Sequence, residues 1–322
     1  MFSLGASFAV SDDNASAVAI DDNVDQIAID EKVINDEKLN VEEDSPTVSA
    51  GEAATVTNDT FKNYFDENGT LRGNVTADEL EFNGTFENVG VDTINLNRTI
   101  KISGDGVLNN ISIDVKAKDV VISGITINQN NGVAAINVYN ASGVTIENAK
   151  INFNANAGSN GFAISADLAN NLKLLNNVIT YAGATTGWEV NNAVRVSNSN
   201  NTEIKGNKIK AKLVSSAVGW AEVPPGSKNW VSSPISEGIV IVDSENVTFD
   251  NNELNVTYST VVGAYDTIYS VDFKNVANAV ISNNVITSAG NSYIYGIIIT
   301  SDNFTIEHKH QCYHQSYNVQ II

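Results

Sequence analysis

Apolar residues recur at the same intervals in five stretches of the chain. In each stretch two apolar residues flank one other residue, a third follows eight positions later, and a fourth lies five positions further on. Alternation over a short run is the period of a half-buried β-strand and does not match the period of a helix. Each stretch therefore predicts short strands with fixed inward positions. The five sets are Ile136, Val138, Ile146 and Ile151; Ile164, Ala166, Leu174 and Ile179; Val194, Val196, Ile204 and Ile209; Ile239, Ile241, Phe249 and Leu254; and Val271, Phe273, Ile281 and Ile286.

Pairs of turn-forming residues separate the third and fourth apolar positions in four of these sets. Asn and Gly tolerate a left-handed backbone, so each pair predicts a tight corner between two strands. Corners that stack on one another would let an Asn side chain hydrogen-bond to the next unit. The pairs are Asn176-Asn177, Gly206-Asn207, Asn251-Asn252 and Asn283-Asn284.

A single repeat buries too little apolar surface to offset the entropy lost in ordering it, so neighbouring repeats must stack. Stacking with one coil per repeat predicts an all-β chain, a right-handed parallel β-helix over residues 57–307. A short helix over Thr60–Phe65, capped by Asn58 or Asp59, is expected to cover the open end of the core.

The connections that follow the last strand of each repeat vary in length and hold all three Trp residues. Since they leave the same corner of successive coils, we expect them to gather on one side. Flat aromatic rings match the apolar faces of sugars, which makes these residues candidates for ligand binding. The alternative is that the loops pack against themselves. The candidates are Trp188, Trp220, Trp230, Tyr258 and Tyr265.

The outward positions of the predicted first strands offer little catalytic chemistry. One column holds Asn137, Ser165, Arg195, Val240 and Asp272, and the next holds Tyr139, Asp167, Ser197, Val242 and Lys274. General acid–base catalysis requires convergent carboxylates, and adjacent coils do not supply them in these columns. Arg195 near Asp167 is interpreted as a surface ion pair. We therefore expect no catalytic residue, no metal, no cofactor and no enzymatic activity.

The net charge, the cysteine count and the length of the apolar runs exclude several classes of protein and of binding partner. The formal net charge of −20 over 322 residues argues against nucleic acid, whose phosphates require clustered Lys and Arg. The single cysteine, Cys312, excludes an internal disulfide framework. No stretch holds the roughly 18 consecutive apolar residues that a membrane-spanning helix needs.

The two ends differ from the repeats. Residues 1–9 resemble the second half of a secretory signal, and residues 10–56, rich in Asp and Glu, predict a disordered spacer. Residues 308–322 form an aberrant tail that holds all three His and the cysteine. Plausible codons for this tail, read in the next frame, continue the repeat, so we interpret the tail as frameshifted. A His/Cys metal site is the alternative.

Two kinds of motif resemble known families. Gly143–Asn148 and Asn278–Ile286 look like the repeats of right-handed β-helices in the pectate-lyase-like superfamily. The segment Phe61–Thr70 and the Asn-rich coils resemble adhesin-like surface proteins of methanogenic archaea. These resemblances cover roughly residues 58–306.

The resemblance implies a secreted or cell-surface adhesin-like protein that presents its aromatic loops to a glycan or protein partner without catalysis. The same superfamily also contains polysaccharide lyases and glycoside hydrolases, which is the alternative. A purely structural spacer is a third possibility. A coil motif of this kind is specific for fold and weak for function.

Overall fold

The computed structural model describes residues 51–314 apart from 52, 131, 157–159, 184–190, 216–218, 223–227, 232–236, 261–266, 291–292, 301–302 and 308–310. These residues belong to one compact unit, Val48–Ile322. The predicted signal-like segment and nearly all of the predicted spacer lie outside the described residues.

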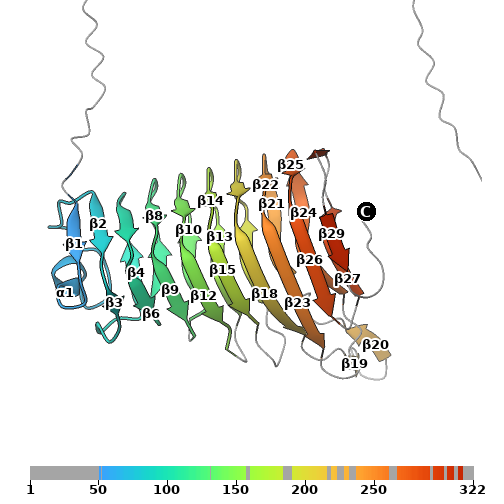
Figure 1. Cartoon of the computed structure of the whole chain (residues 1–322), viewed down its shortest axis with the longest axis horizontal. Coiled ribbons are helices and arrows are strands. Elements are labelled where there is room, and N and C mark those ends of the chain that lie inside the picture. Colours follow the sequence, from blue (N-terminus) through green and yellow to red (C-terminus); the bar gives the residue numbers. More distant parts are fainter. Residues whose placement is uncertain are drawn as a thin grey trace, which may run out of the picture. The chain divides into compact units, whose positions relative to one another are not determined.

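The unit is a right-handed parallel β-helix in which successive coils contribute their strands to three parallel sheets (Figure 1). The ten-stranded sheet consists of β1 (Ala54–Val56), β2 (Glu79–Phe82), β5 (Lys101–Gly104), β8 (Val121–Ser123), β11 (Thr145–Glu147), β14 (Lys173–Leu175), β17 (Glu203–Lys205), β22 (Thr248–Asp250), β25 (Ala279–Ser282) and β28 (Phe304–Glu307). The eight-stranded sheet consists of β4 (Thr93–Leu96), β7 (Ser112–Val115), β10 (Ala134–Tyr139), β13 (Gly161–Asp167), β16 (Asn191–Ser197), β21 (Glu237–Glu245), β24 (Thr267–Ala277) and β27 (Tyr293–Thr300). The nine-stranded sheet consists of β3 (Thr85–Phe86), β6 (Val107–Asn109), β9 (Thr126–Gln129), β12 (Lys150–Asn154), β15 (Val178–Ala182), β18 (Lys208–Ser215), β23 (Glu253–Thr260), β26 (Val285–Gly290) and β29 (Gln311–His314).

The register confirms the predicted inward columns. Ile136, Ile164, Val194, Ile239 and Val271 are successive partners along the eight-stranded sheet, and all are buried. The third and fourth positions of each set form equivalent columns in the other two sheets, for instance Phe249 beside Ile281 and Leu254 beside Ile286. Since parallel strands stack in register, one spacing along the chain becomes a continuous apolar core across the coils.

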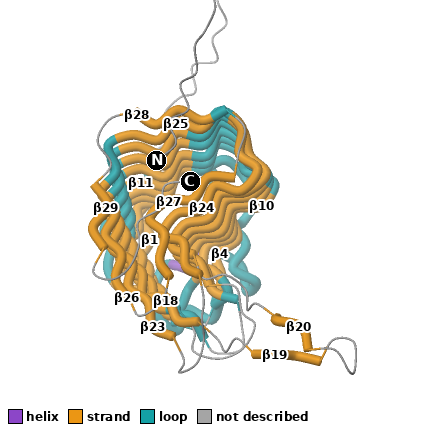
Figure 2. The backbone as a smooth tube through the Cα atoms, turned by 90° about the vertical axis from the view of Figure 1, so that its right-hand side faces the viewer, coloured by secondary structure: helices purple, strands orange, loops and turns teal. Residues whose placement is uncertain are grey.

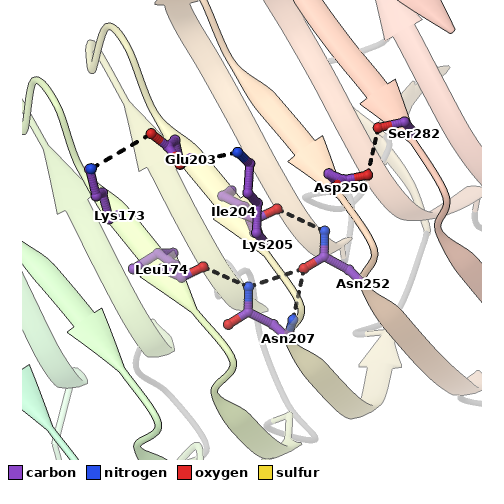
Figure 3. A network of polar contacts seen from close by, with 9 residues as sticks. All are labelled: Lys173, Leu174, Glu203, Ile204, Lys205, Asn207, Asp250, Asn252 and Ser282. Carbon is purple, nitrogen blue, oxygen red and sulfur yellow. Dashed lines mark hydrogen bonds and ion pairs between the residues drawn. The ribbon is translucent and has the colours of Figure 1, made fainter. Parts of the chain in front are cut away.

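The predicted corners form a ladder of buried asparagines, which Figure 3 shows in part. Asn207 donates its side-chain amide to Oδ1 of Asn252 at 3.0 Å and to the carbonyl oxygen of Leu174 at 2.8 Å. Asn177 and Asn284 continue the ladder on either side, and all four side chains are at most 1% exposed. The residue before each of them has a positive φ, as the pairs predicted. The residues with positive φ are Asn176, Gly206, Asn251 and Asn283.

The N-terminal end of the core is covered by α1 (Phe61–Tyr64) and the residues that follow it. Phe61 and Phe65 stack with ring centroids 4.7 Å apart, and both are buried. The helix is shorter than predicted, and Thr60 is its N-cap, without a side-chain cap hydrogen bond. Asn58, predicted as a cap, instead accepts a hydrogen bond from the backbone amide of Glu87 at 3.1 Å, because the next coil lies beside it. Among the described residues, no helix has the length and apolar character to cross a membrane.

The long connection before β21 contains a hairpin of its own, β19 (Gly219–Glu222) and β20 (Lys228–Val231), paired antiparallel. Figure 2 shows this hairpin projecting away from the stacked sheets. The preceding strand, β18, extends to Ser215. Tyr181 lies in β15 and is buried, with its ring stacked on that of Phe153 at a centroid distance of 5.7 Å.

Candidate functional site

The outer face of the eight-stranded sheet carries both outward columns that the spacing predicted. Successive partners in the first column are Asn137, Ser165, Arg195, Val240 and Asp272, and in the second Tyr139, Asp167, Ser197, Val242 and Lys274. Two polar sites lie on this face. One is an open depression toward the N-terminal coils, and the other is a buried cluster further along the sheet.

The depression has a volume of about 420 Å³ and lies over β4, β7, β10 and β13. Its lining combines carboxylates, neutral hydrogen-bonding groups and apolar side chains, the mixture expected of a small-molecule or sugar site. Residues that line it include the carboxylates Asp92 and Asp114, the amide and hydroxyl groups of Asn137 and Ser165, and the apolar side chains of Val133 and Phe162.

Strand geometry sets the separation of the two carboxylates. The backbone amide of Ser112 donates to the carbonyl oxygen of Asp92 at 2.9 Å, and Asp114 is two residues further along the same strand. Asp114 is the register partner of Asn95, three residues beyond Asp92. Three residues and one strand spacing place the backbones of Asp92 and Asp114 about 11 Å apart. Lys116 Nζ lies 3.6 Å from Oδ2 of Asp114, and the amide of Asn137 lies 3.5 Å from its Oδ1.

A buried network holds one wall of the depression. Gln129 donates its side-chain amide to Oγ of Ser112 at 2.7 Å, and that hydroxyl donates to the carbonyl oxygen of Ala134 at 2.7 Å. The Gln129 carbonyl in turn accepts the backbone amide of Gly132 at 3.2 Å. Gln129 and Ser112 are 2% and 8% exposed, so the wall is held by bonds shielded from water.

The buried cluster, which we call the Glu237 cluster, consists of Asn192, Glu237, Asp272 and Lys274. The Lys274 ammonium contacts the carboxylate of Glu237 and lies 3.1 Å from Oδ2 of Asp272. Asn192 donates its side-chain amide to Oε2 of Glu237 at 3.0 Å. Both carboxylate side chains are almost fully buried, at 3% and 2% exposed. Two acids thus share one lysine on the same sheet face as the depression.

Burial has a direct electrostatic effect in this cluster. Burial, together with the neighbouring Asp272, raises the pKa of Glu237 to about 7 against the lowering effect of Lys274. Burial alone would lower the pKa of Lys274, but the two carboxylates reverse this and the net shift is upward. Oδ1 of Asn192 and Oδ1 of Asp272 are buried and accept no hydrogen bond in the described part of the chain. Among the described residues, no group of three or more His, Cys, Asp or Glu side chains is arranged to hold a metal.

The predicted aromatic ligand residues that the structure describes are not among the residues that form either site. Trp188 and Tyr265 are outside the described residues. Trp220 and Trp230 are backbone partners in the β19–β20 hairpin. Tyr258 lies in β23 at 6% exposed and belongs to the apolar core, so its ring has a packing role in this structure. That any of the five contacts a ligand stays a prediction.

Comparison with known proteins supports the fold and nothing further. No family model and no curated protein sequence matches the chain. Solved structures that match include the Streptococcus pneumoniae surface protein and adhesin PfbA, at TM-score 0.36 and 13% identity over 83% of each chain. The catalytic domain of a GH87 α-1,3-glucanase matches at TM-score 0.33 and 11% identity, over 81% of this chain and 68% of that chain. DFA-IIIase from Arthrobacter chlorophenolicus A6 matches at TM-score 0.33 and 11% identity, over 78% of this chain and 72% of that chain. At these values the likenesses carry no argument about activity.

The prediction that the chain is not an enzyme is corrected. Structures of similar fold include catalytic domains as well as an adhesin. The prediction also rested on the lack of convergent carboxylates, and it considered only the two regular outward columns. Asp92 and Asp114 share one depression, and Glu237 and Asp272 share one lysine. A search for acidic residues in the irregular N-terminal coils and at the strand ends would have found Asp92, Asp114 and Glu237.

Proposed function

We propose that this protein binds a polysaccharide across the outer face of the eight-stranded sheet and hydrolyses it in the depression. One observation carries the proposal: Asp92 and Asp114, on neighbouring coils, line the same open depression. Glycoside hydrolysis requires two carboxyl groups, and inverting enzymes keep them about 6.5–9.5 Å apart so that a water molecule fits between them and the sugar. The backbones of Asp92 and Asp114 are about 11 Å apart, and side chains that both lean into the depression bring the two carboxyl groups into that range.

The contacts of Asp114 support a division of roles between the two carboxylates. Asp114 lies beside Lys116 and accepts from Asn137, contacts that compensate a negative charge. It is the general base, which removes a proton from the attacking water. Asp92 is the general acid, which protonates the oxygen of the leaving sugar as the glycosidic bond breaks. The product sugar then has the anomeric configuration opposite to that of the substrate.

The lining also indicates the class of substrate. It includes two carboxylates and no Lys, Arg or His among the described residues, so it disfavours a uronic acid polymer. Val133, 60% exposed, and Phe162 offer apolar contacts for a sugar ring, while Asn137 and Ser165 offer hydrogen bonds for its hydroxyl groups. The proposed substrate is therefore an uncharged polysaccharide, and hydrolysis is favoured over lyase chemistry.

The test is incubation with uncharged glucans, α-1,3-glucan among them, followed by measurement of new reducing ends and of product configuration by NMR. Release of reducing ends with inversion is expected, with a loss of at least about 100-fold in Asp92→Asn and in Asp114→Asn. Asp119→Asn is the matched control, because Asp119 is exposed, lies outside the depression and has a positive φ that Asn tolerates. Full activity of both depression variants would refute the assignment.

A second candidate is adhesion to a glycan or protein at a cell surface through the aromatic connections. Trp220 opposite Trp230 in the projecting hairpin favours it, as does the placement of Trp188 and Tyr265 in connections of the same kind. This candidate also implies that the protein is secreted or displayed on the cell. Glycan-array binding that survives Trp220→Ala and Trp230→Ala would remove it.

A further inference from the structure

Charged residues are distributed unequally among the three sheet faces. The outward columns of the nine-stranded sheet carry Lys150, Lys208, Lys210 and Lys212, and Glu253 is the only acid in the same columns of the described strands. The ten-stranded sheet has acids and lysines mixed in its outward columns, as at Glu79, Lys101, Glu203 and Lys205. In a chain of net charge −20, the nine-stranded face is therefore a local basic patch.

Three of the lysines lie on one strand. Lys208, Lys210 and Lys212 alternate with buried Ile209 and Ala211 along β18, so all three lysine side chains point away from the core on the same face of the sheet. The backbones of consecutive lysines in this set are about 6.7 Å apart, because outward residues recur at every second position of a strand. Lys150 lies two strands away in the same sheet, with β15 between (Figure 1). The four side chains form a flat basic array.

Most of this charge is not neutralised within the described part of the protein. Lys208 lies 3.8 Å from Glu253, but the two side chains are 70% and 64% exposed, so the pair is largely solvated. Lys150, Lys210 and Lys212 have no ion pair with another described residue. By contrast, Lys101 and Lys205 on the ten-stranded face lie 2.9 Å and 3.2 Å from Glu79 and Glu203.

The residues around the array indicate what kind of anion it fits. Asn152, Thr180 and Asn255 are outward neighbours of the lysines, and their small polar side chains suit the hydroxyl groups of a sugar. Arginine and aromatic side chains, which nucleic acid binding uses for phosphate forks and base stacking, are absent from the outward positions of β12, β15, β18 and β23 that the structure describes. At the described outward positions of these four strands, Val178 is the only exposed large apolar residue, so this face offers little that would enter a membrane.

We infer that the outer face of the nine-stranded sheet binds an anionic polysaccharide, one that carries carboxylate or sulfate groups, along the lysines of β18. This site lies on a different sheet from the depression and serves attachment to an acidic matrix, independently of hydrolysis. The strongly negative remainder of the protein repels a polyanion at long range, so binding is confined to the patch and weakens as salt is added.

The experiment measures binding of the full chain to polygalacturonate and to dextran sulfate at low salt, with uncharged dextran of equal length as the reference polymer. Binding to one or both anionic polymers is expected, and the comparison distinguishes carboxylate from sulfate recognition. The triple variant K208Q/K210Q/K212Q is expected to bind about tenfold more weakly or worse, with a shallower salt dependence.

The control is K101Q/K173Q/K205Q, which removes the same charge from the ten-stranded face and should bind within about twofold of the unchanged chain. If the first triple variant does not fold, Lys210→Gln in the middle of the array replaces it. Equal losses in both triple variants would overturn the site, as would binding of uncharged dextran equal to that of the anionic polymers. Tighter binding of a single-stranded DNA oligomer than of either anionic polysaccharide would overturn the ligand class. Hydrolysis at Asp92 and Asp114 is measured separately and is unaffected by either result.

Discussion

Asn207 donates its side-chain amide to Oδ1 of Asn252 at 3.0 Å, although 45 residues separate them along the chain. The β19–β20 hairpin between them projects from the stacked sheets (Figure 2), and the corner of the next coil returns to the same place. The ladder therefore tolerates connections of very different length, because its bonds depend on the coil and not on the loop. This property allows insertions on one side of the molecule to carry function without disturbing the core.

Replacing a rung of the ladder should destabilise the protein strongly. Asn252 accepts from the backbone and side-chain amides of Asn207, and donates to the Ile204 carbonyl and to Asn284. Asn252→Ala leaves buried polar groups without partners, so a loss of about 2–4 kcal/mol in the free energy of unfolding is expected. Chemical unfolding measures it. Asn255→Ala, at an exposed position on β23, is the control and should change stability by less than about 1 kcal/mol.

Stability should depend on pH through Glu237. Its pKa is raised from 4.5 to about 7 in the folded protein, so the unfolded chain loses this proton at lower pH than the folded one. The contribution of this group is fully present below pH 4.5 and is lost as the pH rises toward 7, a change of about 3 kcal/mol. Glu237→Gln keeps the neutral form at every pH. Unfolding from pH 4 to 8 should show the chain losing stability relative to Glu237→Gln, and parallel curves would contradict the prediction.

Removing the shared lysine should be costly at neutral pH. Lys274→Met leaves Glu237 and Asp272 buried beside each other without their cation, which costs about 3–5 kcal/mol. The loss should be smaller near pH 5, where Glu237 is protonated. Combining Lys274→Met with Glu237→Gln removes one of the two buried charges, so the double variant should be more stable than Lys274→Met alone. Additive losses would show that the three side chains do not act as a unit.

The sequence predicted the columns and corners because in-register stacking repeats one geometry in every coil. It did not predict the Glu237 cluster, since Glu237 has the same parity as the inward Ile239. The five residues of β21 from Glu237 through Ile241 are all buried, so alternation fails at the start of this strand, where Gly238 also faces the core beside Val256. Asp92 and Asp114 were missed because they belong to coils that precede the regular repeats. Departures from the repeat carry the candidate chemistry here, and spacing alone does not reveal them.

Two glycines with positive φ should respond differently to the same substitution. A Cβ on Gly104, at φ +105°, would collide with the carbonyl oxygen of Phe82, its partner on β2. A Cβ on Gly84, at φ +85°, would meet no atom within 4 Å. Gly84→Ala should therefore cost only the left-handed strain of about 1–2 kcal/mol. Gly104→Ala should cost about 2 kcal/mol more, because Phe82 is held in the core and its backbone cannot retreat. Chemical unfolding of the two variants side by side decides it, and equal losses would mean that the coils in this region are not packed as tightly as described.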